Sequence, residues 1–368
     1  MLRISGFKKK RICTMLCISC VLLSACSRQS SSSSTQQSTE MVSEEASTDL
    51  LTVELIENNT DNNILSAPDK ASPDVPDGTP IKHEFQTYVY NDFYDEYYSE
   101  ETKNVFYAYC DALMRGDSEL HCTDVNFDTV RRVKLIAGDL MPVAVKHASI
   151  KEISTSDGVA NIEYDISKEE YLEELEVFKS NVTQILDDTC KAGYTDLEKT
   201  LALYDYFVHN YTYDETYTCH TSYGLLTDGS GCGICEDIAG AFIYLLNQAG
   251  VEAFCCYGLT ENNNGHVWSI VKIDGKYYHI DPTFGIDEPD SLKFFGMTDE
   301  RRIQEGFSED WRYSNGEIPN LDNRFSCIDD RFLLLSDSKN CEIDFDNDVI
   351  YYNSGSSDEV KEFHYNEK

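Results

Sequence analysis

The sequence predicts an α+β fold in which one helix begins at a cysteine and an antiparallel hairpin follows it. After Cys235, apolar residues recur at i, i+3, i+4 and i+7 within residues 239–246, which is typical of an amphipathic helix. Residues 266–273 and 276–281 are strand-like runs separated by Asp274–Gly275, a two-residue turn typical of hairpins.

The N-terminus predicts export and a lipid anchor. Residues 1–25 contain five basic residues and the apolar run ICTMLCISCVLLSA, which indicates a secretory signal rather than a spanning helix. The run ends in LSAC and resembles a bacterial lipoprotein signal, which implies that Cys26 is lipidated and becomes the first mature residue. The alternative is an ordinary signal peptide with a chance cysteine. We expect a protein lipid-anchored to the outer face of the bacterial cell membrane.

The next segment, residues 26–84, predicts a disordered tether. It is rich in serine and contains no aromatic residue, so it cannot bury enough apolar area to offset the entropy of ordering. We expect it to hold the folded part away from the membrane.

Residues 85–190 predict a small α+β domain. Residues 104–114 and 169–186 have helical patterns, and residues 145–153 and 159–166 have strand patterns. The segment contains no catalytic constellation, so it either positions substrate or covers one side of the core.

The catalytic domain is predicted at residues 191–315, beginning with a capping box at Thr195–Glu198. Residues 291–307 indicate a strand or turn and a short helix. Residues 316–368 indicate short strands with turns. The acidic stretch 344–348 lacks the glycine and glutamate of an EF-hand calcium loop, so we expect a solvated loop there.

Three side chains supply a nucleophile, a base and an orienting group. Cys235 begins its helix, where the thiolate is stabilised and free backbone amides can hold an oxyanion. The hairpin register places Trp268 opposite Asp281, so His266, two residues away on the same face, lies diagonal to Asp281 and within side-chain reach. The expected chemistry is attack of the Cys235 thiolate on an amide carbonyl.

These residues resemble the transglutaminase-like superfamily, whose motifs G-x-C-x-x-x-A, H-x-W and D-P-T match residues 233–239, 266–268 and 281–283. The resemblance covers Thr195 to Phe307. It implies a papain-like core with a Cys-His-Asp triad. The family includes protein cross-linkers, proteases, peptide amidases and inactive scaffolds.

The resemblance also implies two lesser roles at the site. The Cys235 amide is one expected oxyanion donor and the second is unassigned, although the resemblance implies that Tyr223 lies on the approach to the cysteine as a substrate or oxyanion residue. Trp268 is expected to wall the site or to be simple core. Two non-enzymatic alternatives stay open: a non-catalytic surface binding or adhesion module that retains the fold, and a substrate-binding lipoprotein of a transporter.

A second cysteine, Cys232, forms C-x-x-C with Cys235, which is typical of redox pairs and half zinc sites. No second C-x-x-C exists, so we expect no metal and no cofactor. The further ligands available to such a site are Cys219, His220, Cys255, Cys256 and His279. Ten cysteines follow Cys26, and their pairing is open. A Cys232–Cys235 disulfide is a hypothesis for a redox switch.

The charge limits the partners. The net charge is −36, and loss of residues 1–25 removes five basic and no acidic residues, which lowers it to about −41. Nucleic acid and anionic lipid are therefore excluded as expected partners. We expect a peptide or protein substrate, either cationic or part of a cell wall bearing free amines.

Overall fold

The computed structural model describes residues 76–218, 221–227, 229, 231–313, 318–319 and 325–366. The predicted signal peptide, Cys26 and the tether up to residue 75 lie outside this part of the chain. None of the helices within the described ranges is both long and apolar enough to cross a membrane.

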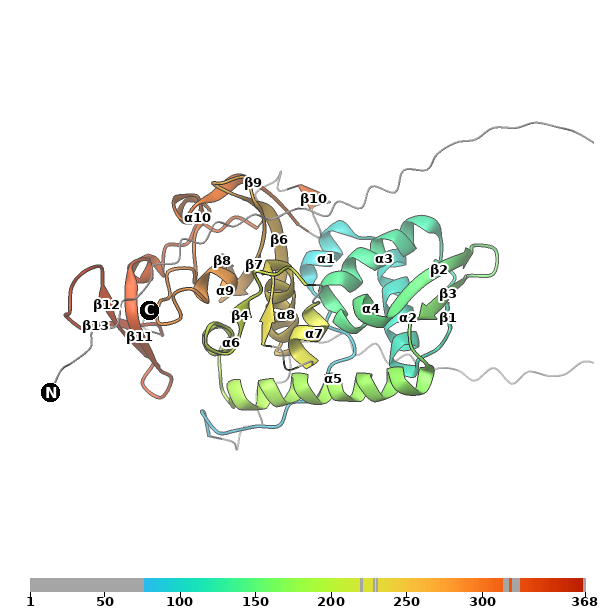
Figure 1. Ribbon diagram of the computed structural model, residues 1–368, viewed down its shortest axis with the longest axis horizontal. Coiled ribbons are helices and arrows are strands. Elements are labelled where there is room, and N and C mark those ends of the chain that lie inside the picture. Colours follow the sequence, from blue (N-terminus) through green and yellow to red (C-terminus); the bar gives the residue numbers. More distant parts are fainter. Residues whose placement is uncertain are drawn as a thin grey trace, which may run out of the picture.

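The N-terminal part is mostly helical and carries one small sheet (Figure 1). The sheet is antiparallel with the order β1-β3-β2. The elements are α1 (Asp92–Tyr97), α2 (Glu100–Arg115), β1 (Glu119–His121), α3 (Phe127–Leu140), α4 (Pro142–His147), β2 (Ala148–Ser154), β3 (Val159–Tyr164) and α5 (Lys168–Thr189).

Two features here differ from the sequence prediction. The strand expected from residue 145 begins only at Ala148, because the preceding residues form α4 with Pro142 at its first position, where the missing N–H of proline has no cost. Helix α3 was not predicted at all, although Asn126 caps it by accepting hydrogen bonds from Asp128 N (2.9 Å) and Thr129 N (3.0 Å).

Residues 76–84 correct the predicted boundary of the tether. The Gly78 N–H donates to Ala192 O (2.8 Å), and the side chain of Lys82 and the backbone N–H of His83 both donate to Asp187 near the end of α5. Backbone pairing and one partly buried carboxylate therefore order a segment that the absence of aromatic residues had assigned to the tether.

The central part packs helices against a five-stranded antiparallel sheet with the order β10-β9-β6-β7-β8. The predicted capping box starts α6, where Thr195 and Glu198 bond each other's backbone. The elements are α6 (Asp196–Asn210), β4 (Thr212–Tyr213), α7 (Ser222–Thr227), β5 (Cys232–Gly233), α8 (Cys235–Gln248), β6 (Ala253–Thr260), β7 (Gly265–Ile273), β8 (Lys276–Ile280), α9 (Pro282–Gly285), α10 (Asp299–Gln304), β9 (Phe307–Tyr313) and β10 (Ile318–Pro319).

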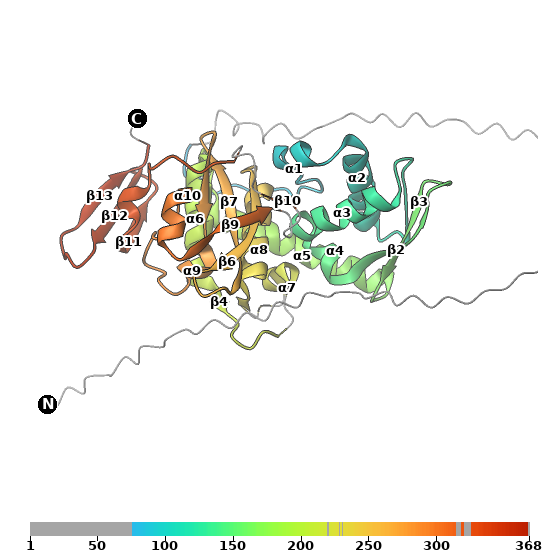
Figure 2. The ribbon, with the colours of Figure 1, turned by 90° about the horizontal axis from the view of Figure 1, so that it is seen from above.

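The hairpin β7–β8 has the predicted register. Ile273 pairs with Lys276, and the turn residues Asp274 and Gly275 have φ of 52° and 77°, as a type I′ turn requires. Helix α8 begins at Cys235, also as predicted, and packs against β6 and β7 (Figure 2). The fold is thus α+β, with a cysteine-led helix on an antiparallel sheet.

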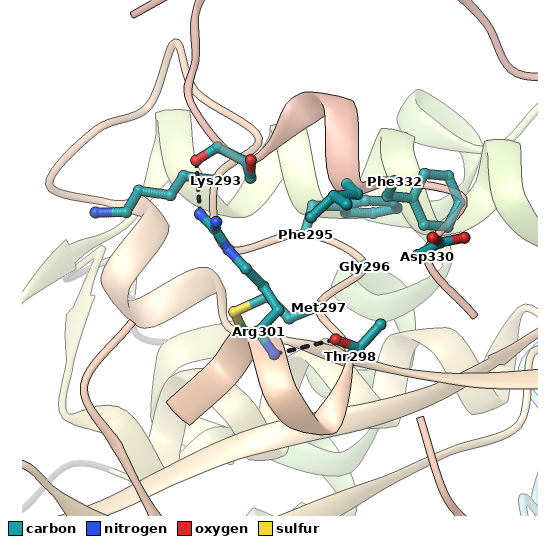
Figure 3. Close-up of a pocket in the computed structure, with 10 residues that line it drawn as sticks. Lys293, Phe295, Gly296, Met297, Thr298, Arg301, Asp330 and Phe332 are labelled. Atoms are coloured by element: carbon teal, nitrogen blue, oxygen red, sulfur yellow. Dashed lines mark hydrogen bonds between the residues drawn. The ribbon is translucent and has the colours of Figure 1, made fainter. Parts of the chain in front are cut away.

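The C-terminal part contains a short 3-10 helix, η1 (Leu333–Leu335), followed by a small antiparallel sheet. The strands of the sheet are β11 (Ser338–Asp344), β12 (Val349–Ser354) and β13 (Lys361–His364). Figure 3 shows how it joins the centre: Phe332 lies beside Phe295 and Gly296, and a Cβ at Gly296 would come within 2.3 Å of the Phe332 ring. The hollow left there is about 10 Å³, room for one water at most.

Candidate active site

The first turn of α8 presents Cys235. The preceding residue, Ile234, is extended, and its N–H donates to Asp237 Oδ2 (3.0 Å), so a carboxylate one turn into the helix fixes the entry of the chain. Cys235 occupies the first helical position, where the backbone N–H has no acceptor within the helix. The residue is buried, with 6% of its surface exposed. Sequence reasoning overlooked Asp237, although its spacing of three residues from the helix cap is a recognisable signal.

The loop before α8 is held by the segment that follows α6. Strand β4 pairs in parallel with β5, and Asp214 N donates to Gly233 O (3.0 Å). Cys232 belongs to β5 and pairs through its backbone with Thr212. No disulfide joins the cysteines in the described part of the chain, so Cys232 and Cys235 are not bonded in this state.

His266 and Asp281 form the polar contact at the centre of the site. His266 Nε2 lies 2.6 Å from Asp281 Oδ2, and neither side chain has exposed surface. Asp281 Oδ1 also accepts the N–H of Phe284 (3.1 Å), so both carboxylate oxygens are fixed. His266 Nδ1 is buried and makes no hydrogen bond to any described residue.

This geometry selects one tautomer of the neutral imidazole. A carboxylate only accepts hydrogen bonds, so the proton lies on Nε2 and points at Asp281. Nδ1 then carries the lone pair and is the nitrogen available to take a proton. The structure therefore brings together two of the three predicted residues and leaves the base nitrogen open.

Helix packing brings Cys235 to the same region. α8 packs against β7, which carries His266, and against α9, which begins directly after Asp281. Gly285 allows α9 also to lie close to α6, since a Cβ there would come within 2.3 Å of the Tyr204 hydroxyl of α6. The hydrogen bonds of the described residues do not include one between the Cys235 thiol and Nδ1.

Aromatic rings hold the imidazole in place. Phe284 stacks on His266 at 4.4 Å between ring centroids, and Trp268 lies nearly parallel to it at 6.1 Å. Trp268 is completely buried, so it supports His266 from the interior rather than lining an open cleft. Phe284 was missed by sequence reasoning, although it directly follows the D-P-T motif.

Behind Trp268 runs a hydrogen-bonded chain from the interior to the partly exposed Asp299. The indole N–H donates to His279 Nδ1 (3.0 Å), and His279 Nε2 lies 2.9 Å from Asp299 Oδ1. Burial lowers the pKa of His279 to about 4. The imidazole is therefore neutral and its Nε2–H donates to Asp299, whose other oxygen accepts Cys327 N (2.9 Å).

The zinc alternative gains no support from the placement of its ligands. His279, Asp299 and Cys327 are the group of described side chains close enough to share a metal ion. Both nitrogens of His279 already serve hydrogen bonds. Cys232 and Cys235 are not in this group, and Cys219 and His220 lie outside the described residues.

Tyr223 lies in a different environment from the one that the resemblance implied. Its hydroxyl donates to Glu174 Oε2 (3.0 Å), which also lies 2.7 Å from His147 Nε2, and its ring stacks on Phe178. Because this hydroxyl is committed to a carboxylate of α5, an oxyanion role for Tyr223 has no support in this arrangement.

The part of the chain that carries this site matches a known protein family. Residues 183–282 match the sequence model of the transglutaminase-like superfamily, and the segment includes Cys235, His266 and Asp281. The resemblance predicted from the motifs is therefore confirmed for this segment, which forms a transglutaminase-like core. No curated protein matches the chain.

Three solved structures are similar to parts of the chain. A candidate cysteine protease from Cytophaga hutchinsonii has 15% identity and a TM-score of 0.25, over 38% of this chain and 63% of that one. A TGase has 16% identity and a TM-score of 0.26, over 43% and 48%. A candidate protease from Parabacteroides distasonis has 11% identity and a TM-score of 0.25, over 46% and 39%. The match spans less than two thirds of each of these proteins.

Proposed function

We propose that this protein is a thiol enzyme that acts on amide bonds of peptides or proteins through Cys235, His266 and Asp281. The observation that carries the proposal is the buried His266–Asp281 pair at 2.6 Å, in which Nδ1 makes no hydrogen bond to any residue that the structure describes. Cys235, at the first position of the helix packed on that strand, supplies the thiol.

The reaction follows from the tautomer. Nδ1 takes the thiol proton of Cys235, and Asp281 stabilises the imidazolium that results. The thiolate attacks the amide carbonyl, and the Cys235 N–H at the start of α8 stabilises the oxyanion. When the intermediate collapses, the imidazolium returns its proton to the departing amine or ammonia and a thioester remains. A thiol–imidazole contact that is open in the free enzyme commonly tightens with substrate bound.

The second half of the reaction has two outcomes. Water attacking the thioester gives hydrolysis, the outcome of a protease or amidase. A primary amine gives a new amide, the outcome of a transglutaminase. The segment up to Cys26, outside the described residues, supports the further proposal that the enzyme works on the outer face of the cell membrane, held by a lipid.

The test is to trap the thioester. The full-length chain is incubated with pools of glutamine-containing peptides and peptide amides, quenched in acid and measured by intact and peptide-level mass spectrometry. The expected adduct lies on Cys235 and equals the peptide mass less ammonia or the leaving amine. It is lost in Cys235→Ala and His266→Ala and kept in the matched variant Cys232→Ala.

Two results would contradict the proposal. One is an adduct that persists in Cys235→Ala. The other is the absence of any adduct on a protein whose Cys235 is shown to be reduced, which favours a binding module that retains the fold.

A further inference from the structure

A cavity of about 360 Å³ opens beside the first turn of α8. Its walls come from α3 and α4 on one side and from α7, α8 and β6 on the other, elements that lie side by side in Figure 1. Its size falls within the range of about 300–1,000 Å³ found for ligand pockets. Ile234 and Glu236, the chain neighbours of Cys235, both line it. A group bound there lies beside the first turn of α8, although Cys235 itself is not among the lining residues.

Asp139 forms part of the cavity wall. Asp139 belongs to α3 and is 4% exposed. Its oxygens accept hydrogen bonds from the hydroxyls of Tyr94 (3.0 Å) and Tyr257 (3.4 Å), but no cation of the described chain pairs with it. Burial, with the nearby charge of Glu236 adding to it, raises the pKa of Asp139 to about 7. An uncompensated buried carboxylate is costly, and a bound cation removes that cost.

Two further carboxylates line the same cavity. Glu236 is exposed at the edge of the cavity and makes no ion pair within the described residues. Asp237 accepts the backbone N–H of Ile234 at the start of α8. Lys134 is the basic side chain among the described lining residues, and its ammonium donates to the Ile150 carbonyl (2.9 Å). The cavity is therefore an acidic recess beside the first turn of α8, lined in the described part of the chain by three carboxyl groups and one ammonium.

We propose that this recess binds a cationic side chain, a lysine ammonium or an arginine guanidinium, on a peptide placed at Cys235, and that Asp139 and Glu236 recognise it. The proposal rests on the proposed function for the position of the peptide. The proposal also assigns substrate recognition to the N-terminal part of the chain. Helix α3 of that part supplies Asp139, one of the two carboxyl groups that recognise the cation.

The cation has two possible sources. It belongs either to the peptide whose amide is attacked or to the acceptor that resolves the thioester. An arginine can serve only the first role, because only a primary amine forms the new amide. A lysine can serve both, after the ammonium has lost its proton.

The first experiment measures binding without chemistry. Fluorescein-labelled octapeptide pools with lysine, arginine, norleucine or glutamate fixed at the centre are titrated into full-length Cys235→Ala, and anisotropy is recorded. Hydrogen bonds to a charged partner predict a preference of about tenfold for the cationic pools over norleucine. The preference falls to about twofold or less in Asp139→Asn and Glu236→Gln. It is kept in Glu342→Gln, a matched loss of one exposed carboxylate on β11.

Equal binding of the lysine and norleucine pools overturns the proposal, as does a preference that all three variants retain or all three lose. Because binding does not require the thiol, these results are independent of thioester formation. In the active enzyme, release of shortened lysine and arginine peptides assigns the cation to the attacked peptide. Condensation products that contain lysine only assign it to the acceptor.

Discussion

The substitution Asp281→Asn isolates the contribution of the carboxylate to the thiol. In the structure, one oxygen accepts the Phe284 N–H and the other faces His266 Nε2. An asparagine that keeps its carbonyl towards Phe284 turns its NH₂ towards Nε2. His266 Nε2 must then accept a hydrogen bond from this NH₂, so the imidazole proton moves to Nδ1. Nδ1 can then no longer take the proton of the Cys235 thiol.

The size of the effect follows from the bond that is removed. A hydrogen bond to a charged group contributes about 1.5–3 kcal/mol, and one pH unit corresponds to about 1.4 kcal/mol. The pH midpoint for rapid alkylation of Cys235 should therefore rise by about one to two units. At pH 6.5, alkylation by iodoacetamide, mapped to Cys235 by mass spectrometry, should slow by about 10- to 100-fold.

The chain offers a matched control in Asp299→Asn. Asp299 also bridges a buried histidine Nε2 (2.9 Å) and a backbone N–H (2.9 Å), but it bonds His279 rather than His266. Asp299→Asn should lose less free energy of unfolding in urea than Asp281→Asn, because the Asp299 side chain is 35% exposed and that of Asp281 is fully buried. Only Asp281→Asn should slow alkylation by tenfold or more. Equal slowing in the two variants, or none in either, would refute the reasoning.

Three further predictions concern stability, each measured by urea unfolding. Gly285→Ala places a Cβ within 2.3 Å of the Tyr204 hydroxyl and 2.8 Å of Val208, so it should lower the free energy of unfolding by about 1–3 kcal/mol. The control Gly138→Ala has open space around it and should leave the free energy of unfolding unchanged or raise it. Equal effects of the two substitutions would contradict the packing described. Burial raises the pKa of Asp139 to about 7, so the unfolded state releases this proton first and the contribution of Asp139 to stability should fall as pH rises from 4 to 7. The free energy of unfolding of Asp139→Asn minus that of wild type should therefore rise over this range, and a difference that does not change with pH would show that Asp139 is not the group. Burial lowers the pKa of His279 to about 4, so the unfolded state binds a proton first and the contribution of His279 to stability should be lost as pH falls from 6.5 to 4. The free energy of unfolding of His279→Gln minus that of wild type should therefore rise as pH falls over this range, and a constant difference would contradict the assignment.

Local patterns were sufficient to predict much of the site. The period of apolar residues after Cys235 predicted α8, and the Asp274–Gly275 turn predicted the register that places His266 near Asp281. Both depend on short-range chemistry: helix spacing in one case and the positive φ of a two-residue turn in the other.

Contacts between residues far apart in the sequence could not be predicted from local patterns. Asp139 lies almost one hundred residues before Cys235, in a helix that sequence reasoning did not identify, and only tertiary packing makes it a wall of the cavity. Tyr223 has the expected place in the chain, but Glu174 on another helix turns its hydroxyl aside. The boundary at residues 76–84 likewise depends on backbone pairing with Lys191 and Ala192, just after α5.

The most direct test of the central claim is the alkylation rate of every cysteine as a function of pH, in wild type and in His266→Ala. The account predicts that Cys235 reacts rapidly well below the ordinary thiol pKa of about 8.5, and that His266→Ala abolishes this reactivity while the other cysteines keep their rates. Slow labelling of a reduced Cys235 that the substitution leaves unchanged would contradict a thiolate–imidazolium pair at this site.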